Sequence, residues 1–310
     1  MNKKIKKVMP VFIILIAVLG VSIVWASLFD VKIKASDGLV SLVNRIYPTP
    51  TPLPEPSIEN LEVAVVPEEG YEVKINWGDT GKKLVKAGGI DMGKFEKNYS
   101  TPNYAELMSY LTESKDKGIN INKESSYFWV NTLWALGLTQ NSKVLSEGIM
   151  GTEYKDRLAN FASTGGWTLG SKAAVDLYSS SNILDLDEAE QEMVSEITSN
   201  IYRPCCGNPT SFPDCNHGMA ILGLVELMVD QGFSEDEIYK ASLMFNSYWF
   251  PQTYIDLAYY FQTEENTLWE ELDAKELLSA QYSSAPGYQA IKEKIGDVPG
   301  TESRGGSCGA

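Results

Sequence analysis

One stretch of 13 residues gathers the side chains of this chain that are best suited to thiol or metal chemistry. It contains Cys205, Cys206, Cys215 and His217, which are three of the four cysteines and the only histidine among 310 residues. Thiolates and imidazoles bind soft and borderline metal ions, and a thiol with a lowered pKa is a strong nucleophile. The sequence therefore predicts a single chemical site in this stretch.

The surrounding residues indicate a loop that leads into a buried helix. Three prolines and one glycine between positions 204 and 213 favour irregular backbone, and residues 219–229 are apolar at nearly every position. Asp214 or Asn216 is expected to cap the helix. Because the start of a helix stabilises negative charge, a thiol placed there should ionise readily.

Three interpretations of the cluster remain open at this point. The first is a structural disulfide from Cys215 to Cys205 or Cys206, which would stabilise the fold by about 2–3 kcal/mol. The second is a metal site in which Cys205, Cys206, Cys215 and His217 bind Zn, Cu(I) or an iron–sulfur cluster. The third is thiol–disulfide exchange, with Cys215 attacking and a neighbouring cysteine resolving.

The fourth cysteine, Cys308, lies in a glycine-rich tail at residues 298–310. It is interpreted as an accessory thiol. It either pairs with the leftover member of the Cys205/Cys206 pair or delivers a metal or a disulfide to the cluster. Whether the protein is an enzyme stays open.

The composition excludes several classes of function. The formal net charge of −15 argues against a nucleic-acid partner, because phosphate backbones are bound by clustered lysine and arginine. A single histidine excludes the two-histidine zinc helix. Any Ser/His/Asp triad would have to use His217.

The N-terminus predicts a membrane anchor. Residues 8–29 carry no charge and follow four lysines, so they are long enough to span a bilayer with the N-terminus in the cytoplasm. The globular part would then be extracytoplasmic and tethered to the cell membrane as a single-pass protein. A cleaved signal peptide is the alternative, and it also places the rest outside the cytoplasm. An envelope redox partner or a metal-delivery partner would fit this location.

The rest of the chain predicts a mainly α fold. Alternating and apolar runs at residues 61–66 and 71–77, joined by a turn at 67–70, favour a small N-terminal β-hairpin. Helical patterns follow, including residues 123–138 and 187–201, and Ser234 with Glu237 forms a capping box. The expected architecture is a single helical globular domain preceded by one transmembrane helix and a Pro-rich linker. Its segments are an anchor at 1–29, a stalk and linker at 30–57, a helical domain at 58–297 and the tail at 298–310.

The cluster also carries a resemblance. Residues 201–220 read Ile-Tyr-Arg-Pro-Cys-Cys-Gly-Asn, then Phe-Pro-Asp-Cys-Asn-His-Gly-Met-Ala, and the tail reads Gly-Gly-Ser-Cys-Gly. With Tyr-Trp-Phe-Pro at 248–251, this resembles a group of uncharacterised membrane-anchored proteins of candidate-phylum bacteria, over most of the globular part. The resemblance implies no particular activity. The layout is more loosely similar to cytochrome c-maturation thioreductases, which carry Cys-x-x-Cys where this chain has adjacent cysteines.

We therefore expect a membrane-anchored extracytoplasmic protein whose Cys/His cluster binds metal or performs thiol–disulfide chemistry. The alternative is a non-catalytic envelope or scaffold protein whose cysteines form structural disulfides.

Overall fold

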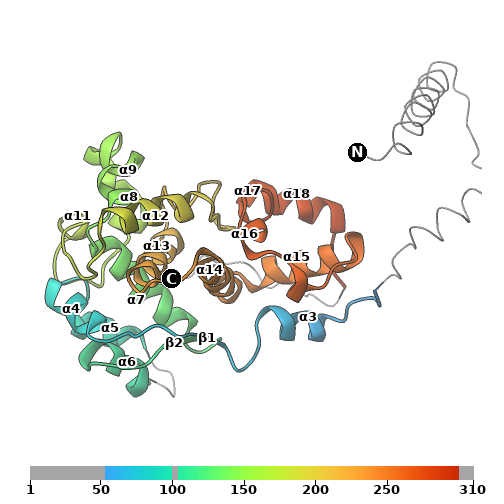
Figure 1. Ribbon diagram of the computed structural model, residues 1–310, viewed down its shortest axis with the longest axis horizontal. Helices are drawn as coiled ribbons and strands as arrows, with labels where there is room; N and C mark the ends of the chain where they lie inside the picture. Colours follow the sequence, from blue (N-terminus) through green and yellow to red (C-terminus); the bar gives the residue numbers. More distant parts are fainter. Residues whose placement is uncertain (1–52, 100–103, 300–310) are drawn as a thin grey trace, which may run out of the picture. The chain divides into compact units, whose positions relative to one another are not determined.

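The computed structural model describes residues 53–99 and 104–299, which belong to one unit that begins at Leu53 (Figure 1). The helices before the cysteine loop are α3 (Ile58–Val65), α4 (Thr80–Ala87), α5 (Met92–Phe95), α6 (Tyr104–Thr112), α7 (Ser126–Thr139), α8 (Lys143–Ser146), α9 (Ile149–Thr152), α10 (Ala162–Gly165), α11 (Ala174–Leu177) and α12 (Glu188–Ser199). Those after it are α13 (Asn216–Asp230), α14 (Glu235–Trp249), α15 (Pro251–Glu264), α16 (Ala274–Leu277), α17 (Ala280–Ser283) and α18 (Ala285–Ile295). Short 3-10 turns are η1 (Glu96–Asn98), η2 (Lys155–Asn160) and η3 (Trp269–Glu271), and the strands are β1 (Tyr71–Val73) and β2 (Ile119–Ile121).

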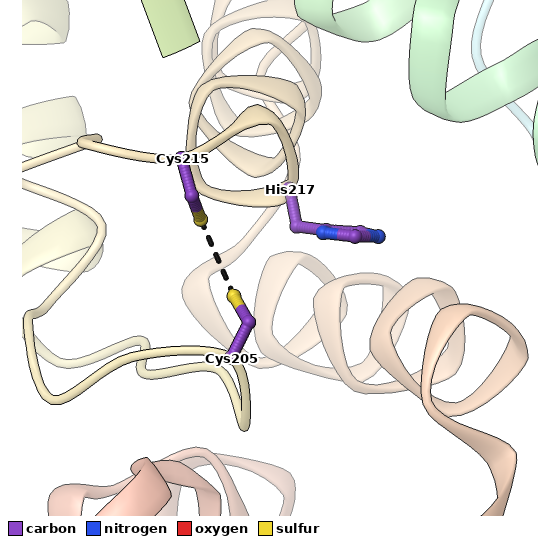
Figure 2. Close-up of side chains that lie close together, drawn as sticks. All are labelled: Cys205, Cys215 and His217. Carbon is purple, nitrogen blue, oxygen red and sulfur yellow. Dashed lines mark hydrogen bonds between the residues drawn. The ribbon is translucent and has the colours of Figure 1, made fainter. Parts of the chain in front are cut away.

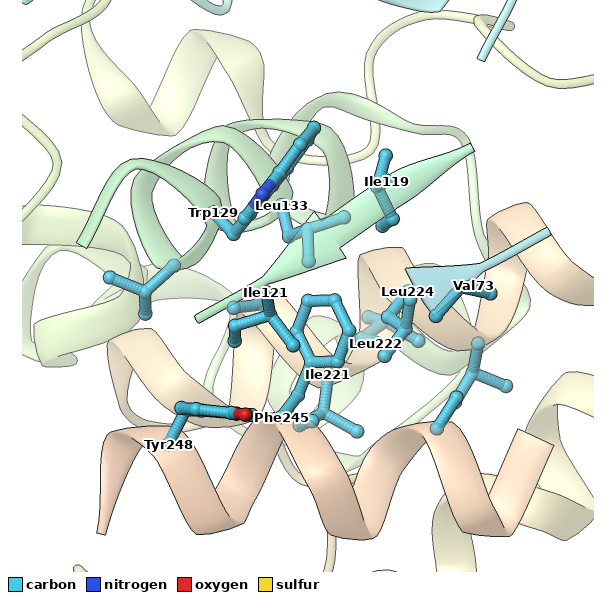
Figure 3. Close-up of a cluster of buried hydrophobic side chains, with 14 of the residues drawn as sticks. Val73, Ile119, Ile121, Trp129, Leu133, Ile221, Leu222, Leu224, Phe245 and Tyr248 are labelled. Atoms are coloured by element: carbon cyan, nitrogen blue, oxygen red, sulfur yellow. The ribbon is translucent and has the colours of Figure 1, made fainter. Parts of the chain in front are cut away.

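The core is built around the contact between α7 and α13, and α10, α12 and α14 also pack on α13. Two glycines let the backbones of α7 and α13 approach closely. A Cβ on Gly137 would lie 2.2 Å from the Met219 carbonyl oxygen, and a Cβ on Gly223 would lie 2.4 Å from that of Leu133. Side chains from both helices, both strands and α14 fill the surrounding space (Figure 3). The helix that starts at the cysteine loop, α13, is therefore closely packed on its neighbours.

The predicted β-hairpin is wrong, although a small antiparallel sheet exists. Residues 58–65 form α3, which is capped by Ser57 and buries Leu61 and Val65, four residues apart on one helical face. The turn at 67–70 is present, with the Gly70 N–H donating to the Pro67 carbonyl. It leads from a helix into β1, and β1 pairs with β2 from far along the chain. A short hydrophobic run is compatible with either a strand or a helix. Here it forms a helix whose apolar face packs on the core.

The structure corrects the expected membrane-spanning helix. Within residues 53–99 and 104–299, no helix is long and apolar enough to cross a membrane. The longest described helices, α13 and α14, have 15 residues each. At about 1.5 Å per residue that is roughly 22 Å, against about 30 Å of hydrocarbon. The predicted span at residues 8–29 lies outside the described residues. The fold class is thus mainly helical with a two-stranded sheet, and the assignment to the cell membrane is corrected with it.

Several local helix signals are confirmed. The predicted helix at residues 187–201 corresponds to α12, and its start carries a capping box of Asp187 with Glu190 that was not predicted. The predicted capping box of Ser234 with Glu237 is present at the start of α14. The first of these helices leads into the cysteine loop.

The cysteine loop, residues 200–215, is pinned by backbone hydrogen bonds at several points. The Thr210 N–H donates to the Ile201 carbonyl, which closes the loop on itself. The Ser163 N–H of α10 donates to the Asp214 carbonyl, and the Ala285 N–H of α18 donates to the Cys206 carbonyl. Elements distant in sequence therefore position the loop against the start of α13.

Candidate functional site: a buried thiol cluster

Cys215 is the N-cap residue of α13. Its backbone is extended, with φ −120° and ψ 164°, and its Sγ accepts a hydrogen bond from the Gly218 N–H at 3.3 Å. The expectation that Asp214 or Asn216 caps this helix is therefore wrong, because the cysteine sulfur takes the capping role. The sulfur lies at the positive end of the helix dipole, where negative charge is stabilised.

Cys205 brings a second sulfur to this place. Its Sγ lies 3.3 Å from the Sγ of Cys215 (Figure 2). A disulfide bond is about 2.05 Å long, so the two sulfurs are in hydrogen-bond contact and both residues are free cysteines. The adjacent Cys206 thiol donates to the Asn208 carbonyl at 3.8 Å, and its sulfur also lies within 4.8 Å of that of Cys215. Both members of the vicinal pair are thus near Cys215, and Cys205 makes the contact at 3.3 Å.

Arg203 is the site residue that sequence reasoning missed. Its side chain has no exposed surface, and its Nε donates to Cys215 Sγ at 3.1 Å. Its Nη1 donates to the Asn208 carbonyl at 3.0 Å. Its Nη2 donates to the Phe212 carbonyl at 3.2 Å and to Asp214 Oδ1 at 2.6 Å. The buried guanidinium therefore places a positive charge next to the Cys215 sulfur. It also connects this sulfur, through hydrogen bonds, to residues 208, 212 and 214 of the loop.

A glycine makes room for this arginine. A Cβ on Gly218 would lie 2.5 Å from three guanidinium atoms of Arg203, so any larger residue at position 218 would have to displace this buried side chain. Two signals of this arrangement were present in the sequence. Arg203 is one of only four arginines in the chain and precedes the vicinal cysteines by two residues, and Gly218 follows Cys215 by three.

The three sulfurs differ in protonation. Hydrogen bonds from the thiols of Cys205 and Cys206, together with the Arg203 charge, hold the pKa of Cys215 well below its ordinary 9.0, although burial opposes this. Hydrogen bonding to the other two sulfurs, and burial, raise the pKa of Cys205. For Cys206 the hydrogen bond with Cys205 lowers the pKa, but contact with Cys215 and burial outweigh it and raise the value to about 11. The hydrogen bonds within the cluster therefore favour the thiolate form on Cys215 and the thiol form on Cys205 and Cys206.

His217 lies next to the sulfurs but faces aromatic rings. It is 4% exposed, and its ring centroid is 4.5 Å from that of Phe250 and 5.5 Å from that of Trp249. The imidazole extends to the side of the line that joins the two sulfurs (Figure 2). Burial lowers the pKa of His217 to about 4, so the ring is neutral. Its Nδ1 has no hydrogen-bond partner among the described residues.

The predicted ligand residues do come together. One ligand atom each from Cys205, Cys215 and His217 lies within 4.8 Å of the others, and the same holds for Cys206, Asp214 and Cys215. The cluster could therefore bind a metal ion or perform thiol chemistry. The donor atoms do not determine which metal it would be. Cys308, the predicted accessory thiol, lies outside the described residues.

The cysteine pair borders a pocket of about 550 Å³. Cys205 and Cys215 form part of its lining, and α7 contributes Tyr127, Asn131 and Trp134. Sequence reasoning did not anticipate this pocket, because its walls come from segments far apart in the chain. The sulfur pair is thus next to a space that can hold another molecule.

No family model, curated protein or solved structure matches this chain. The function is therefore inferred from the geometry of the cluster itself.

Proposed function

We propose that this chain performs thiol–disulfide exchange, with Cys215 as the attacking thiolate and Cys205 as the resolving thiol. The observation that carries the proposal is the pair of donors on Cys215. Arg203 Nε at 3.1 Å and the Gly218 N–H at 3.3 Å both point at its sulfur. Such donors compensate a negative charge, and the thiolate is the form of cysteine that attacks disulfides.

The separation of the sulfurs favours exchange over metal coordination. Two thiolates on one tetrahedral zinc, with Zn–S bonds of about 2.3 Å, lie roughly 3.8 Å apart. Here Cys205 Sγ and Cys215 Sγ are 3.3 Å apart, which suits a thiol donating to a thiolate. The positive charge of Arg203 at 3.1 Å from Cys215 Sγ would also repel a metal cation.

The chemical steps balance without a further reagent. The Cys215 thiolate attacks one sulfur of a substrate disulfide, the substrate S–S bond breaks, and one substrate thiolate leaves and takes a proton from water. Cys205 then loses its proton and attacks the Cys215 sulfur of the mixed disulfide. The second substrate thiol is released, so the substrate disulfide is reduced while Cys205 and Cys215 are oxidised to a disulfide.

The proposal is tested by mapping which cysteines pair. Full-length protein is equilibrated in a series of oxidised and reduced dithiothreitol buffers, quenched with acid and digested for mass spectrometry. We expect a Cys205–Cys215 disulfide that forms and breaks reversibly. Cys206→Ser is the matched control, because it removes the neighbouring sulfur and should leave this pair intact, whereas Cys205→Ser and Cys215→Ser should abolish it. All variants carry Cys308→Ser as well, so that the tail thiol cannot substitute.

Turnover separates exchange from a structural disulfide. A protein that exchanges thiols should reduce a peptide disulfide repeatedly when dithiothreitol regenerates it. A Cys205–Cys215 bond that resists dithiothreitol in the folded protein and gives no turnover would overturn the proposal and assign the cysteines a structural role. Pairing through Cys206 instead of Cys205 would overturn the assignment of the resolving thiol.

Metal binding is the second candidate, because Nδ1 of His217 has no hydrogen-bond partner among the described residues and His217 lies close to Cys205 and Cys215. Cys205, Cys215 and His217 would then be the ligands of Zn or Cu(I). Elemental analysis of the purified full chain tests this directly. A stoichiometric metal that is lost in Cys215→Ser and in His217→Phe would favour this function over exchange.

A further inference from the structure

The pocket beside the sulfurs indicates what kind of disulfide would be bound. It holds about 550 Å³, within the range of small-ligand and peptide pockets. Cys205, Cys215 and Asn216 lie in its lining, and the opposite walls come from α7 and from the segment that follows α10. A substrate disulfide that reached the Cys215 sulfur would therefore place its neighbouring residues in this pocket.

The walls of the pocket are aromatic and their polar atoms are already used. Trp134 and Trp167 pack with ring centroids 4.9 Å apart. The Trp134 Nε1–H donates to the Ser163 carbonyl at 2.6 Å, and the Trp167 Nε1–H donates to the Gly89 carbonyl at 2.9 Å. The two indoles thus offer the pocket ring carbons, which favour an aromatic or aliphatic side chain.

The polar part of the lining consists of amides and carries no charged group. Asn98, Asn131 and Asn216 are among the lining residues, and none of the lining side chains is a lysine, arginine, aspartate or glutamate. Side-chain amides can both donate and accept, as a peptide backbone requires. The nearest cation on the site, Arg203, is fully buried and its donors are taken by the loop and by Cys215.

The same lining is unfavourable for anionic disulfides. A carboxylate in the pocket would find no cation to pair with, and it would lie close to the Cys215 thiolate. The chain as a whole carries a formal charge of −15, which adds long-range repulsion. Oxidised glutathione carries four carboxylates, so it should be a poor substrate.

Resting on the proposed exchange activity, we propose that the pocket selects polypeptide disulfides flanked by uncharged, apolar residues. In this assignment an aromatic or aliphatic side chain next to the substrate cysteine lies against Trp134 and Trp167. The backbone of the same segment lies along the asparagine amides.

The test compares the rates at which three disulfides oxidise the reduced full-length protein carrying Cys308→Ser. They are oxidised glutathione, the disulfide-linked dimer of acetyl-Trp-Cys-Gly-amide and that of acetyl-Gly-Cys-Gly-amide. We expect the tryptophan peptide to react about tenfold faster than the glycine peptide. Glutathione should be slower still by about tenfold. The gap to glutathione should persist at about 1 M salt, where the Debye length is only about 3 Å and long-range repulsion is screened.

A charge placed in the pocket gives the matched variant pair. Thr168 is exposed and lines the pocket, so Thr168→Lys should raise the rate with glutathione relative to the rate with the neutral peptides by roughly threefold to tenfold. Val175 is 45% exposed and is not part of the lining, so Val175→Lys adds the same charge elsewhere and should change no rate by more than about twofold.

The outcomes separate this inference from the proposed function. Absence of reaction with all three disulfides would contradict exchange itself. Equal rates with glutathione and the neutral peptides, unchanged in Thr168→Lys, would leave exchange standing and overturn the selection by charge. Equal rates for the tryptophan and glycine peptides would overturn the role of the indole wall.

Discussion

Two completely buried ionisable side chains lie at α13, one beside its first turn and one on the helix itself. They differ in whether hydrogen-bond partners surround the ionisable group. Arg203 lies under the first turn, where its guanidinium donates to the Cys215 sulfur, to the Asp214 carboxylate and to two loop carbonyls. Glu226 lies in the third turn, and neither of its carboxyl oxygens has a hydrogen-bond partner among the described residues. Both side chains have 0% exposed surface.

The difference appears in their protonation. Burial raises the pKa of Glu226 well above 4.5, and the neighbouring Ser142 hydroxyl offsets only part of this. Burial therefore favours the protonated, neutral form of Glu226 in the folded protein. Arg203 keeps its charge because counter-groups surround it, although the start of a helix repels a cation. The Cys215 thiolate is one of those counter-groups, so the arginine and the reactive sulfur stabilise each other.

The comparison of Arg203 with Glu226 indicates which part of α13 can carry a reactive, charged group. A buried charge persists only where the loop supplies partners, and that is also where a pocket reaches the sulfurs. The Glu226 region lacks both features among the described residues and is interpreted as packing. The following predictions test each side of this contrast.

The largest effect is expected for Arg203→Met. The variant leaves the Cys215 thiolate and two loop carbonyls without their donor, so we expect a loss of about 3–5 kcal/mol in the free energy of unfolding. Denaturant titration of the full-length chain measures it. Arg203→Lys keeps the charge but not the fork of donors and should fall in between. A loss below about 1 kcal/mol for the methionine variant would contradict the role of Arg203.

Gly218→Ala should also destabilise the protein, because the added Cβ would lie 2.5 Å from the Arg203 guanidinium. We expect a loss of about 1–3 kcal/mol from this overpacking, read from the denaturation midpoint. Gly93→Ala in α5 is the matched control, since its Cβ would meet only Asp91 Oδ1, at 3.4 Å. That change should be neutral or slightly stabilising. Equal effects of the two substitutions would show that the close contact at Gly218 relaxes freely.

Glu226→Gln should change how stability depends on pH. The pKa of Glu226 is raised in the folded state, so wild-type stability falls as pH rises above the unfolded value near 4.5. The slope is up to about 1.4 kcal/mol per pH unit until the folded pKa is reached. Glutamine removes this loss, and the variant should be more stable than wild type at neutral pH. Glu59→Gln, at an exposed position, is the control and should keep the wild-type profile. Parallel pH profiles for Glu226→Gln and wild type would show that Glu226 is ionised when folded.

The smallest effect is expected for His217→Phe. Phenylalanine preserves the ring packing on Trp249 and Phe250 and removes the unpartnered Nδ1. We expect stability to change by less than about 1 kcal/mol and the exchange rate to stay the same. His217→Ala, which leaves a cavity, should lose about 2–4 kcal/mol. Loss of activity in the phenylalanine variant with its stability retained would give Nδ1 a chemical role.

The sequence predicted the parts of this site that depend on local pattern. Cys205, Cys215 and His217 do come together. This was predictable because the prolines and glycine of the loop and the apolar run of the helix are local sequence signals. The capping box of α14 was predicted because Ser234 and Glu237 are three residues apart. These features need no knowledge of the rest of the fold.

The sequence did not predict the parts that depend on long-range packing. Residues 61–66 were expected to be a strand, but residues 58–65 form a helix. Segments distant along the chain meet in the pairing of β1 with β2 and in the walls of the pocket. Arg203 was missed for the same reason, since an arginine in a loop is usually solvated. In the structure Arg203 has no exposed surface, and its guanidinium lies against Gly218.

The central claim is that Arg203, beside the thiols of Cys205 and Cys206, helps to keep the pKa of Cys215 low. The most direct test is the alkylation rate of Cys215 against pH, resolved by mass spectrometry in the full-length chain with Cys205, Cys206 and Cys308 changed to serine and in the same chain with Arg203→Met. Because the first background lacks two thiol donors, it isolates the contribution of the arginine and the helix. We expect the alkylation rate to level off at a lower pH with Arg203 present than without it, because the guanidinium stabilises the thiolate. The same pH profile in both proteins would contradict the claim.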